Sequence, residues 1–497
     1  MREERNIISS KLPIILFGFL VLSFLFYTIH CSAIILFPYD LDYYEGHELR
    51  NAVLLSEGNS IYTSLNEPPY VPSTYTPLYS IVAAALIKIF GVGFFAGRFL
   101  TFIASLIIGV LIFDIVKTKT NNTFIGLISS FLFFSTNCVY YWGAFFRVDM
   151  LAVMFSLLGF YIASKHEHDI TSKYLWLSLV PFVLAVYTKQ SQVFALLAVS
   201  VWLFFKDWKL SVKYFSSFIL ICGVIFLFVN YVTKGQFWVH LIEYQNVPWK
   251  LGLIIGSNYY FLLYFSVLVV IGLAYVINSL TREDLSLFSL YFLTTGFITA
   301  ILVGHVGSAV YYYIEFVAIA CILVGFSSVE LFELRDESFK WRNREASDPK
   351  KVLLCTFLIV QLLIFANIPY ISMGETLRYP FYGYTPRHDD LVKGQIVSSY
   401  ISNSPGLVLI EEQGFAVLNN KEVYFDFMQL NLLQRTGAFD SSPIQKDIEN
   451  QKFSLIVLSN ECLSQNILDA IHANYETVDV VDVKVRYDYY IYVPKVG

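Results

Sequence analysis

Long apolar runs constrain this chain more than any other feature of its sequence. The run from Leu12 to Phe37 contains no Asp, Glu, Lys or Arg. About 20 such residues in an α-helix cross the hydrocarbon core of a bilayer, and lipid admits only helices and closed barrels. Hydrophobic residues make up 56% of the chain and charged residues only 15%, so the constraint applies to most of it. We expect a mainly α-helical, polytopic membrane protein.

About eleven segments are long and apolar enough to be membrane spans. They are residues 12–37, 97–116, 123–141, 146–164, 174–188, 192–206, 213–231, 259–279, 285–303, 309–332 and 352–368. Lys and Arg gather at the N-terminus, in Lys206–Lys213 and in Glu333–Lys351, which all fall on one side. The positive-inside rule therefore predicts a cytoplasmic N-terminus and an extracytoplasmic C-terminal region.

The segment Tyr79–Phe95 is apolar but short, and Lys88, Gly91 and Gly93 interrupt it. If it crossed the membrane, every later basic loop would move to the outer side. We therefore predict an interfacial or re-entrant helix within a first outer loop of residues 38–96.

The sequence changes character after Asn367. Short apolar runs alternate with turn residues through residues 370–497, and one helical stretch lies among them. This pattern predicts a small soluble α/β domain that follows a membrane module of residues 1–369.

The first outer loop is rich in acidic residues. Its carboxylates are Asp40, Asp42, Glu45, Glu48, Glu57 and Glu67, against the single arginine Arg50 in residues 37–78. Carboxylates beside a bilayer are costly to desolvate, and they commonly hold a proton, a metal ion or a polar substrate. Asp40-Leu-Asp42 also has the D-x-D spacing of a metal-binding pair, for Mg²⁺ or Mn²⁺.

Further polar residues occur where spans meet the outer side. They are Arg98, Arg147, Asp149, Lys189, Gln190, His240, Glu243, Gln245, Asn246, His305, Tyr311, Tyr312, Tyr313 and Glu315. Cations and acids together suit a ligand with a phosphate and hydroxyl groups.

Most of these residues also have a structural alternative. Arg98 can reach lipid headgroups, and Arg147 can form a local ion pair with Asp149, which then caps the next helix. Lys189 can be a turn residue at the interface, His240 and His305 can be interfacial histidines, and the run Tyr311–Tyr313 can belong to an aromatic belt.

The order of these motifs resembles that of C-type (GT-C fold) glycosyltransferases, in particular family 39-like enzymes related to protein O-mannosyltransferases and aminoarabinose transferases. The matching segments are Asp40–Gly46, Leu54–Tyr62, Thr74–Tyr79, Arg147–Asp149 and Thr188-Lys189. Two departures stand out. Thr-Pro-Leu replaces a Lys-Pro-Pro-Leu element of relatives, and a tyrosine stands where relatives often have an aspartate before the glutamate.

The resemblance implies transfer of a sugar from a polyprenyl-phosphate donor to a hydroxyl or amine on the outer face of a plasma (inner) membrane. It implies a first-loop carboxylate as general base, with Glu45 favoured over Asp42 and Asp40. Arg98, Arg147 and Lys189 are expected to bind the phosphate. The expected orienting residues are Asp149, Gln190, His240, Glu243, His305 and Tyr313. The acceptor is left open between glycan, lipid and protein, and no nucleic-acid partner is expected.

Two other functions remain open. A transporter should show paired repeats and ionisable groups near the bilayer midplane, whereas the charges here lie at span ends. A non-catalytic scaffold of cell-envelope assembly would tolerate replacement of all three leading acids of the first loop, Asp40, Asp42 and Glu45.

Overall fold

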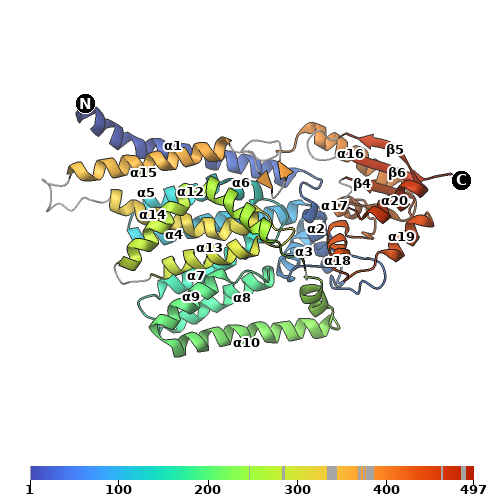
Figure 1. The fold of residues 1–497 in the computed structure, drawn as a ribbon, viewed down its shortest axis with the longest axis horizontal. Helices are drawn as coiled ribbons and strands as arrows, with labels where there is room; N and C mark the ends of the chain where they lie inside the picture. The colour runs from blue at the N-terminus through green and yellow to red at the C-terminus, as the bar shows by residue number, and fades with distance from the viewer. Residues whose placement is uncertain are drawn as a thin grey trace.

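The structure, a computed structural model, comprises a helical bundle and a smaller α/β part at one end of it (Figure 1). It describes residues 2–245, 247–281, 286–332, 344–367, 371–372, 375–376, 385–459, 463–482 and 488–496.

A helix or a helix pair lies at each expected span. These are α1 (Arg2–Leu36), α4 (Phe95–Thr120), α5 (Thr123–Ser135) with α6 (Asn137–Trp142), α7 (Asp149–Lys165), η1 (Lys173–Ser178) with α8 (Leu179–Thr188), α9 (Phe194–Lys206), α10 (Trp208–Val232), α12 (Leu251–Thr281), α13 (Leu287–Leu302), α14 (Ile314–Phe332) and α15 (Arg344–Asn367). Within the described ranges, five helices are long and apolar enough to cross a membrane, and shorter apolar helices accompany them. The prediction of a polytopic helical membrane protein is confirmed.

The first loop folds into two helices between the bundle and the α/β part (Figure 1). Helix α2 (Tyr43–Ser56) begins after Asp42, whose extended backbone and side-chain bond to the Tyr44 N–H make it the N-cap. Helix α3 (Leu78–Phe90) occupies most of the predicted interfacial segment and ends at Gly91, which has a φ of +87° that favours glycine. Residues 70–76, which we call the strap, join the two helices across the end of the bundle.

The α/β part follows α15, close to the predicted division between residues 369 and 370. Its elements are α16 (His388–Asn403), β3 (Val408–Ile410), α17 (Gln413–Leu418), α18 (Phe427–Arg435), α19 (Ser442–Glu449), β4 (Leu455–Leu458), α20 (Gln465–Asn474), β5 (Tyr475–Val481) and β6 (Tyr489–Pro494), and the two-stranded β1 (Ile371–Ser372) and β2 (Glu375–Thr376) precede them. The sheet order is β3-β4-β6-β5, with β3 parallel to β4 and β6 antiparallel to both neighbours.

Strand β4 explains why this sheet needs helices on both faces. All four of its residues are buried, and alternate side chains enter two separate cores. Ile456 and Leu458 pack with α18, α19 and α20, whereas Leu455 and Val457 pack with α16 and α17. A fully apolar strand is typical of a sheet that is covered on both sides.

The strap also enters the α/β part. Tyr70 pairs with Phe425 as an isolated parallel bridge, in which the Tyr70 N–H donates to Tyr424 O at 2.8 Å and the Asp426 N–H donates to Tyr70 O at 3.0 Å. The ring of Tyr70 belongs to the same apolar core as α18 and α19. The first loop and the α/β part therefore form one continuous structure over the end of the bundle.

Two further short helical turns complete this end. Helix α11 (Gln236–Trp238) continues into η2 (Val239–Glu243) after α10, and η3 (Val310–Tyr313) precedes α14.

Candidate functional site

The buried guanidinium of Arg98, on α4, is saturated with hydrogen bonds. Its Nε and Nη2 donate to the two carboxylate oxygens of Glu45 at 2.8 and 2.6 Å. Its remaining N–H groups donate to the carbonyl oxygens of Ile34, Phe37 and Tyr39 at 2.5 to 2.9 Å. A guanidinium has five N–H groups, and all five are used here. Arg98 therefore holds the end of α1 and the start of the first loop together.

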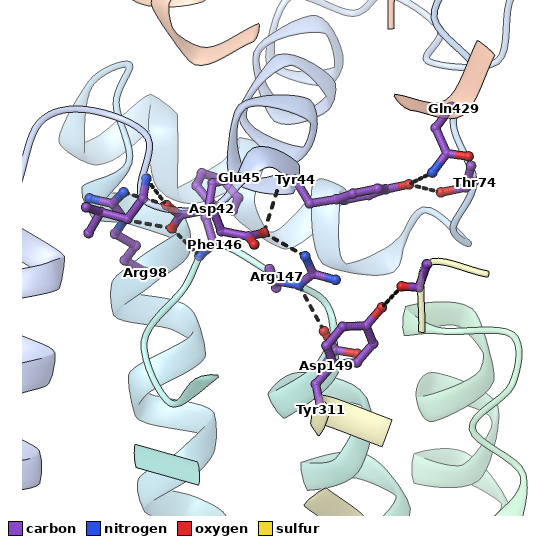
Figure 2. Close-up of polar contacts among 12 residues, drawn as sticks. Asp42, Tyr44, Glu45, Thr74, Arg98, Phe146, Arg147, Asp149, Tyr311 and Gln429 are labelled. Carbon is purple, nitrogen blue, oxygen red and sulfur yellow. Dashed lines mark hydrogen bonds and ion pairs between the residues drawn. The ribbon is translucent and has the colours of Figure 1, made fainter. Parts of the chain in front are cut away.

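Glu45 is equally occupied. Besides Arg98, its carboxylate accepts the backbone N–H of Leu41 at 2.9 Å and that of Phe146 at 2.7 Å. Figure 2 shows the Glu45–Arg98 pair, and both of its side chains are fully buried. The pair joins α2, α4 and the segment that leads into α7, and it leaves no open face on the carboxylate.

Figure 2 shows Asp42, Arg147 and Asp149 beside this pair. They form a second cluster of charges together with Lys189, which follows α8. Arg147 Nη1 donates to Asp42 Oδ1 at 2.6 Å, and its Nε contacts Asp149 Oδ2 at 3.3 Å. Lys189 Nζ donates to Asp149 Oδ1 at 2.7 Å. The order Asp42–Arg147–Asp149–Lys189 alternates acid and base across three elements.

Aromatic rings enclose the two cations. The guanidinium carbon of Arg147 lies 4.6 to 5.1 Å from the ring centroids of Tyr44, Trp142 and Tyr311. Lys189 Nζ lies 4.8 and 4.2 Å from the rings of Tyr311 and Tyr312. Rings of this kind stabilise cations and exclude water, so electrostatic interactions with a ligand are strengthened here.

Unlike Arg98, these two cations retain donors for a ligand. Arg147 uses its Nε–H and one Nη1–H toward described residues, and Lys189 uses one of its three ammonium hydrogens. Their side chains are only 8% and 5% exposed. Partly desolvated cations with spare N–H groups are suited to a phosphate.

Asp42 is the most accessible carboxylate of the cluster. Its Oδ1 accepts from both Arg147 and the Tyr44 N–H, and no bond from a described residue ends on Oδ2. Its side chain is 20% exposed, against 4% for Asp149. Asp42 can therefore accept a proton from an incoming molecule without breaking its contact with Arg147.

Asp40 lies elsewhere, between α2 and α17. A Cβ on Gly46 would come within 2.7 Å of Asp40 Oδ1, and a Cβ on Gly414 within 2.2 Å of Oδ2. The carboxylates of Asp40 and Asp42 thus have different surroundings. Among the described residues, no group of three or more His, Cys, Asp or Glu side chains is arranged to hold a metal ion.

Of the other residues predicted to orient the substrate, some lie beside the charge cluster and some lie away from it. Gln190 Nε2 donates to the carbonyl oxygen of Thr74 in the strap, beside the charge cluster. Tyr313 points away from the cluster: its hydroxyl donates a hydrogen bond to Asn258 Oδ1, and its ring stacks on Phe261. His305 forms a backbone bridge with Trp249, and Glu243 is exposed.

His240 fastens the strap. Its Nδ1 accepts the Ser73 N–H at 2.9 Å, so its Nε2 carries the proton and donates to Thr63 O at 2.7 Å. Burial lowers the pKa of His240 to about 4, which keeps this neutral tautomer at physiological pH. Another buried group of the loop, Glu48, accepts a bond from Ser80, and burial raises the pKa of its carboxyl.

Tyr44, Thr74 and Gln429 were not predicted as site residues, and Gln245 and Tyr311 were noted as outer-face polar residues without an assigned role. Tyr311 lies in the same tyrosine run as Tyr313, and only the geometry of η3 decides which ring faces Arg147. Gln429 belongs to α18, whose approach to α2 carries no signal in the sequence.

Comparisons with known proteins agree with this architecture. Residues 72–233, which include Arg98, Arg147 and Lys189, match the family described as dolichyl-phosphate-mannose-protein mannosyltransferase. A search of curated proteins found no match.

Two solved structures share the fold over almost the whole chain. ArnT from Cupriavidus metallidurans, solved with undecaprenyl phosphate, has a TM-score of 0.59 at 11% identity and covers 95% of this chain and 97% of its own. The oligosaccharyltransferase AglB from Archaeoglobus fulgidus, solved with an inhibitory peptide and a dolichol-phosphate, has a TM-score of 0.54 at 10% identity and covers 94% and 74%. The predicted GT-C fold and the predicted class of enzyme, a membrane glycosyltransferase, are confirmed.

Proposed function

We propose that this glycosyltransferase moves a sugar from a polyprenyl-phosphate carrier to a hydroxyl or amine of an acceptor. Two proteins of the same fold were solved with polyprenyl-type lipid phosphates, and this supports a donor of that kind. The observation that carries the proposal is the pair Arg147 and Lys189. Both have spare N–H groups and share Asp149, and Arg147 also contacts Asp42, whose second oxygen accepts no bond from a described residue.

The chemistry follows from these positions. The acceptor oxygen or nitrogen attacks the anomeric carbon while its proton passes to Asp42 Oδ2, and the bond from that carbon to the phosphate oxygen breaks. The electron pair of the broken bond stays on the lipid phosphate, where Arg147 and Lys189 stabilise the added charge. Asp149, between the two cations, positions both.

This assignment differs from the one that the sequence favoured. Glu45 has four hydrogen bonds on its buried carboxylate, two of them from Arg98, so neither oxygen is open to an incoming acceptor. Arg98 likewise has no donor left for a phosphate. We therefore assign the base role to Asp42, and a structural role to Glu45 and Arg98.

We further propose that the site faces the extracytoplasmic side of a plasma membrane. The site lies at the end of the bundle next to the α/β part, and helices α9 and α14 run away from it (Figure 1). In the sequence, the basic segments Lys206–Lys213 and Glu333–Lys351 come at and after the ends of these two helices, and the positive-inside rule puts such segments on the cytoplasmic side.

The test separates donor binding from transfer. Purified protein is given a radiolabelled polyprenyl-phosphate sugar together with a membrane extract as acceptor. We expect Asp42→Asn to retain donor binding and lose transfer by about 10²- to 10⁴-fold, as for a general base. Arg147→Gln should weaken donor binding, and the exposed Arg435→Gln serves as its matched control.

Two outcomes would contradict the proposal. Full transfer activity of Asp42→Asn would show that Asp42 is not the general base. If Asp40, Asp42 and Glu45 could all be replaced without effect, the non-catalytic scaffold function would be favoured. If neither Arg147→Gln nor Lys189→Met changed the affinity for the lipid donor, these two residues would not form the phosphate-binding site.

A further inference from the structure

A cluster of neutral polar side chains converges on Thr74 of the strap. Gln190 and Gln245 each donate from Nε2 to Thr74 O, at 2.8 and 2.9 Å. The Thr74 hydroxyl pairs with the Tyr44 hydroxyl, and Gln429 Nε2 donates to the Tyr44 hydroxyl at 3.2 Å (Figure 2). These five residues form what we call the glutamine cluster.

The members of the glutamine cluster come from separate elements. Gln190 lies in the turn between α8 and α9, Gln245 follows η2, Tyr44 is on α2, and Gln429 is on α18 of the α/β part. The strap is also fastened independently, because His240 binds the Ser73 N–H and the Thr76 hydroxyl donates to Val186 O at 2.8 Å. The strap is therefore held without the glutamines, and Gln429 bonds to Tyr44 rather than to the strap.

The three glutamines have acceptor capacity left over. Each uses its amide nitrogen within the cluster, and Gln190 Oε1 is buried with no partner among the described residues. In the same part of the chain, no hydrogen bond ends on Oε1 of Gln245 or Gln429. Carboxamide oxygens without partners, beside two hydroxyls, match a ligand that donates several O–H groups. The cluster itself contains no carboxylate to pair with an ammonium group.

The glutamine cluster also lies next to the phosphate-binding cations. Gln190 follows Lys189 in the chain, and the ring of Tyr44 lies 5.1 Å from the guanidinium carbon of Arg147. A ligand whose phosphate contacts Arg147 and Lys189 thus has its next group within reach of the cluster. We propose, on the basis of the function above, that this cluster binds the donor's sugar and selects a neutral, hydroxyl-rich sugar over one that bears an ammonium group.

The experiment compares the affinity of the detergent-solubilised full chain for three classes of synthetic lipid. These are bare polyprenyl phosphate, polyprenyl phosphates carrying neutral hexoses (mannose, glucose or galactose), and polyprenyl phosphate carrying 4-amino-4-deoxyarabinose. We expect at least one neutral sugar to tighten binding about tenfold over the bare lipid, the equivalent of two net hydrogen bonds. The ammonium-bearing sugar should give no such gain.

Substitutions then test whether the glutamine cluster causes this gain in affinity. Gln190→Met and Gln429→Met should each reduce it at least threefold and leave the affinity for bare polyprenyl phosphate unchanged, since the cations are intact. Gln429 does not contact the strap backbone, so its variant tests the cluster even if Gln190→Met disturbs the fold. Gln236→Met, in the same segment as Gln245 but outside the cluster, is the matched control.

The outcomes distinguish the two proposals. If bare polyprenyl phosphate does not bind at all, both the proposed function and this inference fail. If the bare lipid binds but no neutral sugar adds affinity, the inference alone is overturned. The same holds if the gain survives both substitutions, or if the ammonium-bearing lipid binds more tightly than every neutral one.

Discussion

Two carboxylates of the first loop, Asp42 and Glu45, lie three residues apart and have opposite surroundings. Glu45 accepts hydrogen bonds at both oxygens and is fully buried, whereas Asp42 keeps one oxygen for a ligand. The difference arises because Asp42 caps the start of α2, while Glu45 points from its first turn toward α4. At the residue scale, burial and hydrogen-bond partners decide which of the two acids can act as a general base.

Replacement of Glu45 should therefore affect stability more than chemistry. Glu45→Ala leaves the Arg98 guanidinium buried without its counter-charge, a change that costs about 3–5 kcal/mol in comparable pairs. We expect a large fall in the apparent Tm of the detergent-solubilised protein, followed by differential scanning fluorimetry. Glu57→Ala, an exposed acid of the same loop, should leave the Tm almost unchanged. A Glu45→Ala protein as stable as wild type but inactive would restore Glu45 as the base.

Transfer should not depend on a divalent metal ion. A donor with a single phosphate needs limited charge compensation, and Arg147 and Lys189 supply it. We expect the transfer rate to be unchanged after dialysis against EDTA. Loss of activity that Mg²⁺ or Mn²⁺ restores would show that Asp42 takes part in a metal site that forms only with substrate.

The sequence pointed to the charged residues of the candidate site and to the local pair of Arg147 with Asp149, but not to the longer-range pairs. Arg147, Asp149 and Lys189 were noticeable because charged side chains at the ends of apolar spans are rare and costly. The pair of Arg147 with Asp42 could not be predicted, because the two residues are 105 positions apart and meet only through the packing of α2 against the bundle. The saturation of Arg98 by three carbonyl oxygens likewise depends on where α1 ends.

At the scale of elements, the helices could be predicted more fully than the connections between them. Hydrophobic length fixed the positions of the spans, and the short, glycine-interrupted segment was expected to form the separate helix α3. The strap has no comparable signal. Its path is set by side chains from η2 and from the turn between α8 and α9, and by the backbone bridge to Phe425 just before α18. No periodicity in residues 70–76 indicates these partners.

The strap should open in mild acid because of His240. Its folded-state pKa is about 4 and its ordinary value 6.5, so between these values the unfastened form binds a proton that the fastened form excludes. The stabilisation is complete above pH 6.5 and is lost as the pH falls toward 4. We expect protection of the Ser73 amide against hydrogen exchange, corrected for intrinsic rates, to fall about tenfold per pH unit in this window.

Two variants make this measurement specific. His240→Gln can still donate and accept but does not titrate, so its Ser73 protection should not change between pH 6.5 and 4. His472→Gln, at an exposed position on α20, should behave as wild type. Unchanged Ser73 protection in the wild-type protein across this range would show that His240 does not fasten the strap.

At the scale of the whole molecule, a buried polar contact adds to the apolar core and the strap bridge in joining the α/β part to the first loop. The buried Asp426 accepts from His47 Nδ1 at 3.1 Å, from the Tyr43 hydroxyl at 3.0 Å and from Gln413 Nε2 at 2.8 Å. The sequence predicted the α/β part from its strand-like runs, but this interface depends on side chains from α2 and α17 that meet only in the folded chain. The α/β part thereby closes one side of the site rather than standing apart from it.

Loss of Asp426 should release the α/β part from α2 and weaken catalysis. Burial alone would raise the pKa of Asp426, but the hydrogen bonds from His47 and its other partners outweigh this and lower it, so the contact should persist from pH 7 down to the ordinary range of an aspartate. Asp426→Ala leaves His47, Tyr43 and Gln413 without their common acceptor. We expect faster hydrogen exchange in α2 and α18, and lower transfer because Gln429 no longer reaches Tyr44, whereas the exposed Asp469→Ala should match wild type. Normal transfer by an Asp426→Ala protein whose α18 exchanges rapidly would mean that the bundle and the first loop suffice for catalysis without the α/β part.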